Sequence, residues 1–220
     1  FAILLALVLF LLIFDWNKAK PWINERVSEA TGRNFAINGD LFLSWQRAEP
    51  ATDSWRDWIP VPRLNAHDIV LGNPAWDKTD GKMAEIGQIS FSVNPLPLLS
   101  KTIVIPSLQL DDPIVTLQRI ADGNNNWTFK QTEPSAWTLD LQHLYLYRGE
   151  ITLKDDIQHI DAKANIDTLE PNAVNDFVMS WKVAGSFNGA RISGDGKAGA
   201  LLALKLSLIH ISEPTRRYAI

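Results

Sequence analysis

The residue types best suited to chemistry in this chain are histidines and paired carboxylates, and their spacing predicts no site. His67, His143 and His159 are isolated from one another, without the His-Glu-x-x-His spacing that brings two imidazoles to one metal ion. The pairs Asp111-Asp112 and Asp155-Asp156 fall where strands are expected to end, and aspartate bonds its own backbone in such turns. We therefore expect no catalytic residues, no metal ligands and no cofactor.

Two further patterns lead to the same expectation. Gly194-Asp195-Gly196 lacks the Gly-Lys-Ser of a phosphate cradle and is interpreted as tight turns. No serine lies in a Gly-x-Ser-x-Gly elbow, so an envelope hydrolase has no supporting motif. With 21 basic and 25 acidic residues the net charge is −4, which excludes nucleic acid as an expected partner. The chain has no cysteine, which removes disulfides and thiolate metal sites.

The chain opens with an unbroken apolar run, Phe1 to Phe14. A spanning helix needs about 20 apolar residues, and the chain does not begin with Met, so we expect residues 1–16 to be a truncated transmembrane anchor. The alternative is a signal peptide, but no Ala-x-Ala cleavage site follows the run. Trp16 and Trp22, interspersed with lysines, are instead typical of a membrane interface.

The last segment, residues 206–220, has a different character. Leu206 to Arg216 matches the conceptual translation of a common sequencing adapter. We expect this segment to be an artefact of sequence assembly, so that His210 has no function and the β domain before it is incomplete.

Between these ends the periodicity predicts a mainly β protein. Apolar residues at helical spacing, with Pro21 near the start and Gly32 at the end, indicate a juxtamembrane helix within residues 17–34. The β domain then covers residues 35–205, and its first two strands are expected to form a hairpin. Apolar alternation between turn signals predicts an antiparallel sheet with strands over 35–37, 41–45, 63–71, 86–93, 103–110, 114–120, 127–130, 139–147, 150–154, 160–166 and 177–187.

One soluble helix is too little to cover so many apolar strand faces. The sheet can close on itself as a barrel or sandwich, which periodicity alone favours, or curve into a groove whose apolar face meets lipid. The best candidates for a lipid-facing lining, equally consistent with ordinary core, are Ile103, Ile105, Leu108, Leu110, Val115 and Leu117.

A series of short blocks resembles the amino-terminal region of the AsmA family, which comprises inner-membrane-anchored periplasmic proteins of Gram-negative bacteria. The order of the blocks carries the resemblance. They are Phe14-Asp15-Trp16-Asn17, Lys20-Pro21-Trp22-Ile23, Ala30-Thr31-Gly32-Arg33, Ile37-Asn38-Gly39-Asp40-Leu41, Trp55 to Pro60, Leu71-Gly72-Asn73-Pro74, Pro95 to Leu99, Asp112-Pro113, and Asn124 to Phe129.

The resemblance implies a twisted, groove-like sheet related to the chorein-like ends of lipid-transfer proteins, in place of a closed barrel. It implies a single-pass anchor in the inner membrane, a periplasmic location and a role in outer-membrane biogenesis. Phospholipid is the expected partner. The alternative is a membrane-anchored scaffold that acts on outer-membrane protein assembly through contacts with envelope proteins.

Overall fold

The computed structural model describes residues 14–46, 61–77, 81–92, 100–129, 138–169 and 178–199. Residues 1–13 of the apolar run and the segment 206–220 lie outside these ranges. Within them, no helix combines the length and the apolar character needed to cross a membrane.

The predicted helix is present. A single turn, η1 (Trp16–Ala19), leads into α2 (Lys20–Thr31), with Pro21 in the first turn, where its missing N–H costs nothing. Gly32 ends the helix with φ 66°, a left-handed conformation that glycine adopts without strain.

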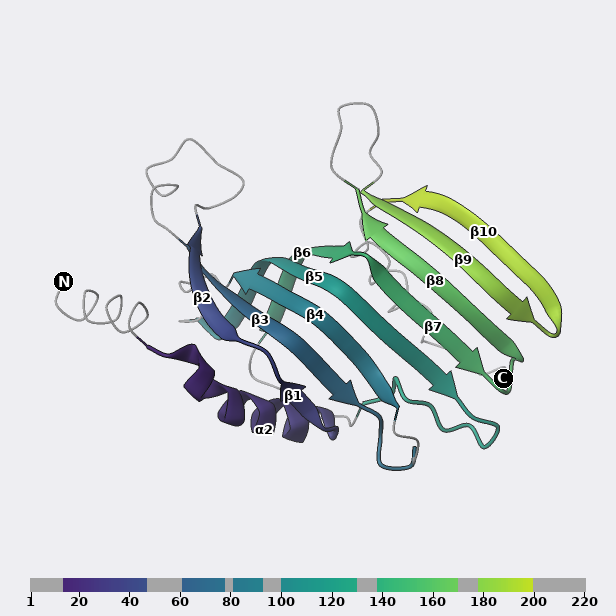
Figure 1. The fold of residues 1–220 in the computed structure, drawn as a ribbon, viewed down its shortest axis with the longest axis horizontal. Coiled ribbons are helices and arrows are strands. Elements are labelled where there is room, and N and C mark those ends of the chain that lie inside the picture. The colour runs from purple at the N-terminus through teal and green to yellow at the C-terminus, as the bar shows by residue number, and fades with distance from the viewer. Residues whose placement is uncertain are drawn as a thin grey trace, which may run out of the picture.

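The strands form one open sheet, not a closed barrel (Figure 1). Its path is β1-β3-β4-β5-β7-β8-β9-β10, with β2 also paired to β3 and β6 also paired to β5. The strands are β1 (Phe35–Ile37), β2 (Leu41–Gln46), β3 (Val61–Gly72), β4 (Lys82–Ser92), β5 (Thr102–Arg119), β6 (Thr138–Tyr147), β7 (Gly149–Asp155), β8 (Ile160–Thr168), β9 (Met179–Phe187) and β10 (Ala190–Ala198).

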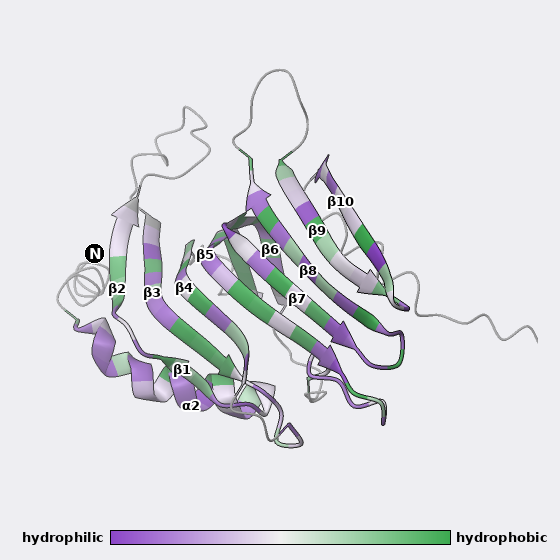
Figure 2. Ribbon diagram, turned by 45° about the vertical axis from the view of Figure 1, so that its right-hand side comes forward, coloured by the Kyte–Doolittle hydropathy of each residue, from purple (hydrophilic) through white to green (hydrophobic). Residues whose placement is uncertain are grey.

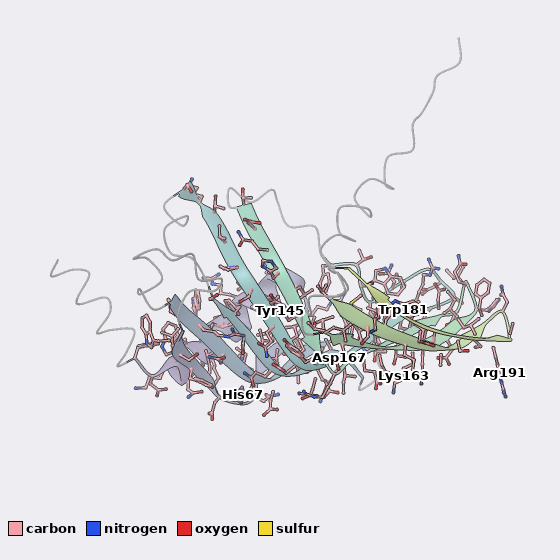
Figure 3. The ribbon with its side chains drawn as sticks, turned by 90° about the horizontal axis from the view of Figure 1, so that it is seen from above. His67, Tyr145, Lys163, Asp167, Trp181 and Arg191 are labelled. Atoms are coloured by element: carbon pink, nitrogen blue, oxygen red, sulfur yellow. The ribbon has the colours of Figure 1, made fainter. Side chains whose placement is uncertain are left out.

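Two predictions about strand pairing are wrong. β1 and β2 do not form a hairpin: both pair with β3, because the Asn38-Gly39 turn bonds to β3, where Asp68 O accepts from Asn38 N at 3.0 Å. The sheet is also not wholly antiparallel. One edge of β5 pairs in parallel first with β6 and then with β7. The first halves of β5 and β6 consequently rise out of the plane of the other strands (Figure 3).

Three predictions about strand extent are also wrong. The strands predicted at 103–110 and 114–120 are one strand, β5, which runs through Asp112-Pro113. Residues 127–129, the described part of the predicted strand 127–130, are irregular. Gly194-Asp195-Gly196 lies in β10 and not in turns, because the Trp181 ring covers these glycines: a Cβ on Gly196 would lie 2.8 Å from its Cζ2 atom.

The buried core lies where α2 and η1 pack on the first strands. Ile37, Leu41, Ala66 and Ile69 form one cluster, with Ile69 only 2% exposed, and Ile23 of α2 packs against it. The helical segments therefore cover the β1–β3 end of one sheet face.

The same helical segments also satisfy the backbone along the sheet edge. Asn17 Oδ1 accepts from Leu41 N at 3.0 Å, and Asn24 Oδ1 accepts from Ile37 N at 3.1 Å. Ser28 Oγ accepts from Phe35 N at 3.0 Å. These three donors would otherwise be open to pairing with another chain, so the helix protects this edge.

A line of irregular residues, which we call the crease, crosses the middle of the sheet. It consists of Asp68, Gly87, Asp112 and Arg148, which lie opposite one another at the same level of the register. Asp68, Asp112 and Arg148 have φ of 51°, 51° and 54°. A left-handed residue interrupts the alternation of side chains along a strand. Since neighbouring strands are interrupted together, their ladders stay in register.

Blocks of the family resemblance meet at one end of the sheet. Buried Arg33 donates to Thr128 O at 3.0 Å, and its guanidinium lies 4.7 Å from the centre of the Phe129 ring. Asn126, which is 0% exposed, donates to Asn73 Oδ1 at 3.0 Å and to Thr116 O at 2.8 Å, and accepts from Gln118 N at 2.8 Å. These separate blocks thus form one hydrogen-bonded clamp.

Gly39 lies in the turn between β1 and β2, next to Asp68 of the crease. We predict that this position tolerates no side chain. A Cβ there would lie 2.8 Å from both Asp68 Oδ2 and His67 Cβ. We expect Gly39→Ala to lower the free energy of unfolding by about 1–3 kcal/mol, the usual cost of overpacking. Urea denaturation measures the change. Gly199→Ala is the matched control, since no atom lies within 4 Å of its added Cβ, and an equal loss in both variants would contradict the prediction.

The clamp predicts a second stability effect. Asn126→Ala leaves Gln118 N–H and Thr116 O without the partner that Asn126 provides, and each buried unpaired group costs about 1–3 kcal/mol. Thermal unfolding should show a lower midpoint for this variant. Asn124→Ala, in an exposed turn where the side chain donates to Asp122 Oδ2, should stay close to the parent.

Candidate functional site

The two faces of the sheet differ sharply in polarity. Directly paired residues share a face, so the register assigns each side chain to one side. Figure 2 shows the resulting alternation of hydrophobic and hydrophilic residues along β7 and β8. Figure 3 shows Trp181 on one side of the strands, with Lys163 and His67 on the other.

We call the side that carries Trp181 the apolar face. Beyond the helix-covered β1–β3 end it continues without a break from β4 to β10. Its members there are Ala84, Ile86, Ile89, Phe91, Leu108, Leu110, Val115, Leu117, Ile151, Leu153, Ile160, Ala162, Ala164, Ile166, Trp181, Val183, Phe187 and Ile192.

The crease keeps this set on one side. Ala66 and Ile69 are three residues apart, as are Ile89 and Ile86, yet all four pack in or against the same core cluster. With strict alternation a step of three would place them on opposite faces. In β3 the left-handed residue Asp68 cancels that change, and Gly87 occupies the matching position of β4.

The predicted lipid-facing residues divide between the two faces. Leu108, Leu110, Val115 and Leu117 lie on the apolar face, because each is opposite an apolar residue of β4 or β7. Ile103 and Ile105 lie on the other face. They are five and three residues before Leu108, and side chains alternate between the faces along this part of β5. These apolar residues lie in one segment of the sequence, but residues of one segment need not share a face.

The two predicted interface tryptophans differ in their surroundings. Trp22 is 62% exposed on α2. Trp16 packs against the core cluster and meets the Phe14 ring edge to face, with 5.3 Å between the centroids. Contact of either ring with a membrane stays a prediction.

Among the described elements, only η1 and α2 pack over the apolar face, and only at its β1–β3 end (Figure 1). The residues on β7 and β8 are half-buried by their neighbours in the sheet. Towards the β9–β10 turn the face is open, with Phe187 43% and Ile192 39% exposed. This is a large apolar surface of the kind that marks a binding site.

The opposite face, which we call the polar face, is hydrogen-bonded within itself. Buried Ser90 donates to Asn65 Oδ1 at 2.8 Å, and Asn65 donates to Ser44 Oγ at 2.9 Å. Lys163 pairs with Glu150 at 2.6 Å. A hollow of about 480 Å³ between β7 and β10 is lined by polar and charged residues of this face, such as Asn165, Asp167 and Lys182, together with Ile166 and Trp181.

The titratable groups form pairs and not a reactive cluster. In the described ranges no three His, Asp or Glu side chains are grouped as metal ligands would be. His67 packs edge to face on Phe42 and His143 stacks on Tyr145, so both rings have structural contacts. Asp155-Asp156 lies at the end of β7, as predicted, whereas Asp111-Asp112 lies inside β5 and not at a strand end.

Two aspartates are held ionised by arginines. Arg148 donates to Asp112 from Nε at 2.6 Å and from Nη2 at 2.9 Å, and these bonds lower the pKa of Asp112. At the end of the apolar face Arg119 donates to Asp155, and this bond is the main reason that the pKa of Asp155 is lowered. The Arg148–Asp112 pair joins β5 at the crease to the residue between β6 and β7. The Arg119–Asp155 pair joins the end of β5 to the end of β7.

The fold and this surface define a class of protein: an open, twisted β-sheet with one wetted and one apolar face, edged by a short amphipathic helix. The comparisons assign the family. The AsmA family model matches residues 1–211. The AsmA family protein YhjG of Escherichia coli (strain K12) is 35% identical over 230 residues, which cover 92% of this chain and 33% of that protein.

The chain therefore belongs to the AsmA family, which is a family of envelope proteins, and the resemblance drawn from the sequence blocks is confirmed. It spans about a third of the length of this relative. No solved structure matches it. That residues 206–220 are foreign to the protein stays a prediction.

The Arg148–Asp112 pair predicts a pH-dependent contribution to stability. Because the pKa of Asp112 is lowered by folding, the contribution is present above the ordinary aspartate pKa of about 3.9 and is lost as pH falls through the lowered value. Asn keeps the left-handed backbone that Asp tolerates, so Asp112→Asn isolates the charge. We expect the variant to be less stable than the parent at pH 7, with the difference shrinking in acid. A difference that is constant with pH would contradict this.

Proposed function

We propose that this protein is a non-enzymatic component of the bacterial envelope that binds phospholipid acyl chains on its apolar face. It is anchored in the inner membrane by its first residues, with the bulk of the chain in the periplasm, and serves outer-membrane biogenesis. The observation that carries the proposal is an apolar surface running from β4 to β10 over which the described residues place no second layer.

The energetics suit binding without chemistry. Each methylene moved from water to an apolar surface contributes roughly 0.8 kcal/mol. Burial of about five methylenes is then worth roughly 4 kcal/mol, or a thousandfold in the binding constant. The charged side chains of the polar face keep the other side in water, as Lys163 and its pair with Glu150 illustrate.

Adjacent positions on β8 allow a matched test of the proposal. Ala164 lies on the apolar face opposite Ile151 and Val183, whereas Asn165 lies on the polar face opposite Glu150 and Lys182. We expect Ala164→Asp to reduce several-fold the phospholipid that co-purifies with the chain in mild detergent, since a carboxylate there must lose its water to admit a tail. Asn165→Asp adds the same charge one residue away and should leave the lipid unchanged. Mass spectrometry of extracted lipid gives the measurement.

The scaffold alternative predicts a different result. If the apolar face is covered by protein in the native assembly, neither the parent nor either variant carries phospholipid above the background of the detergent extract. Circular dichroism of both variants separates loss of binding from loss of folding. A folded Ala164→Asp protein that keeps its full lipid content would refute the proposal.

A further inference from the structure

The hollow of about 480 Å³ crosses the polar face from β7 to β10. Three consecutive residues of β8, of β9 and of β10 line it, namely 165–167, 180–182 and 195–197, together with Arg148 and Gly149. The first and last residue of each triplet point to the polar face, and the middle residue points to the apolar face. The hollow is therefore a trough between two rows of polar-face side chains, and the main chain of the middle residues forms its floor.

The two rows are the walls of this trough. One wall consists of the cross-strand neighbours Asn165, Lys182 and Asp195, and the other consists of Asp167, Ser180 and Lys197. The walls are two residues apart along each strand, which is roughly 7 Å. From β7 to β10 the trough crosses three strand spacings, which is roughly 14 Å. The trough is thus narrow and long, and it runs across the strands.

The side chains of the trough have few partners of their own. Elsewhere on the polar face, at β3 and β4, buried polar side chains bond to one another. In the trough, by contrast, Asn165, Lys182, Asp195 and Lys197 make no side-chain hydrogen bond or ion pair within the described part of the chain. These four side chains are exposed, so their donors and acceptors are available to a ligand.

Two further groups of the trough are held in fixed positions. Asp167 Oδ1 accepts from Arg148 N at 3.2 Å. The guanidinium of Arg148 uses Nε and Nη2 to bind Asp112, and no described residue accepts from its Nη1. The trough therefore has one oriented acceptor and one oriented donor at its β7 end, beside the more flexible lysines of β9 and β10.

The charges of the trough nearly cancel. The charge of Arg148 is matched by Asp112, and the charges of Lys182 and Lys197 are matched in number by Asp167 and Asp195. Such a lining does not select a strongly charged ligand, and its polar groups would lose their water without compensation under an acyl chain. It suits an uncharged ligand that donates and accepts hydrogen bonds along its whole length. Hydroxyl groups do both, and a sugar carries several on each ring.

We infer that the trough binds an uncharged saccharide chain, which lies across β7 to β10 with its hydroxyl groups bonded to both walls. The chain belongs to a family of envelope proteins, and bacterial envelopes are rich in glycans. The site uses the polar face alone, so the inference goes beyond the proposed function and does not rest on it. Bound in this way, a glycan would hold the wetted side of the sheet and leave the apolar face open.

Isothermal titration calorimetry of the full chain tests the inference with two uncharged probes. Chitotetraose represents N-acetylated glycans of the cell-wall type, and maltotetraose represents unmodified hexose chains. We expect at least one to bind, and to bind several-fold more tightly than its own monosaccharide, because a chain reaches more of the trough. Salt should change this affinity little, since no ion pair forms with the ligand. Failure of both tetrasaccharides to bind would overturn the inference, as would a monosaccharide that binds equally well.

Two lysines of the polar face provide matched variants that locate the site. Lys182 lines the trough, whereas Lys163 is paired with Glu150 outside it. We expect Lys182→Gln and Asp195→Asn each to weaken saccharide binding several-fold, and Lys163→Gln to leave it unchanged. An equal loss in the two lysine variants would reject the trough as the binding site.

The Ala164→Asp variant separates this inference from the proposed function. Its substitution lies on the apolar face, so it should bind saccharide as the parent does even where its phospholipid is lost. A folded Ala164→Asp protein that no longer binds saccharide would contradict a separate site on the polar face.

Discussion

The structure depends on one geometric constraint: β3, β4 and β5, which run through the crease, must change their side-chain alternation at the same level. A single left-handed residue in one strand would turn the remaining side chains of that strand to the wrong face. Here Asp68 and Asp112 both adopt φ 51°, Gly87 lies between them, and Arg148 follows at φ 54°. The interruption is shared, so the apolar side stays apolar on both halves of the sheet. Arg148, which bonds Asp112 through two nitrogens, holds the line where β5 changes partner from β6 to β7.

The two ends of the sheet differ in how far other elements cover them. At the β1–β3 end the polar side chains of the helix occupy backbone donors and its apolar side chains cover the core, so both the edge and the face are satisfied. The clamp around Asn126 fixes the loop after β5 in the same manner. Towards β10 the described elements provide no such cover. The fold thus combines a closed, well-packed start with an open apolar continuation.

Local patterns predicted much of this organisation. Pro21 and Gly32 marked the start and the end of the helix, and period-two alternation found β6, β7, β8 and β9 close to their observed bounds. The errors share a cause, which is that pairing is not local. Asn38-Gly39 has the composition of a hairpin turn, but its partners lie on β3. Gly194 and Gly196 have the composition of turns, but the Trp181 ring of the next strand supplies the missing side-chain cover. Ile105 and Leu117 looked equivalent along the chain, yet they face opposite sides.

The sequence by itself determined that the chain is mainly β and which family it belongs to, because composition, periodicity and the order of short blocks are properties of the chain alone. Only the tertiary structure decided whether the sheet closes, which apolar residues share a face, and which polar residues form the walls of the trough. The reason is physical. An irregular residue such as Asp112 changes the face to which the following side chains of its strand point. Whether the neighbouring strands change at the same level depends on the strand register, which is set by residues far away in the sequence.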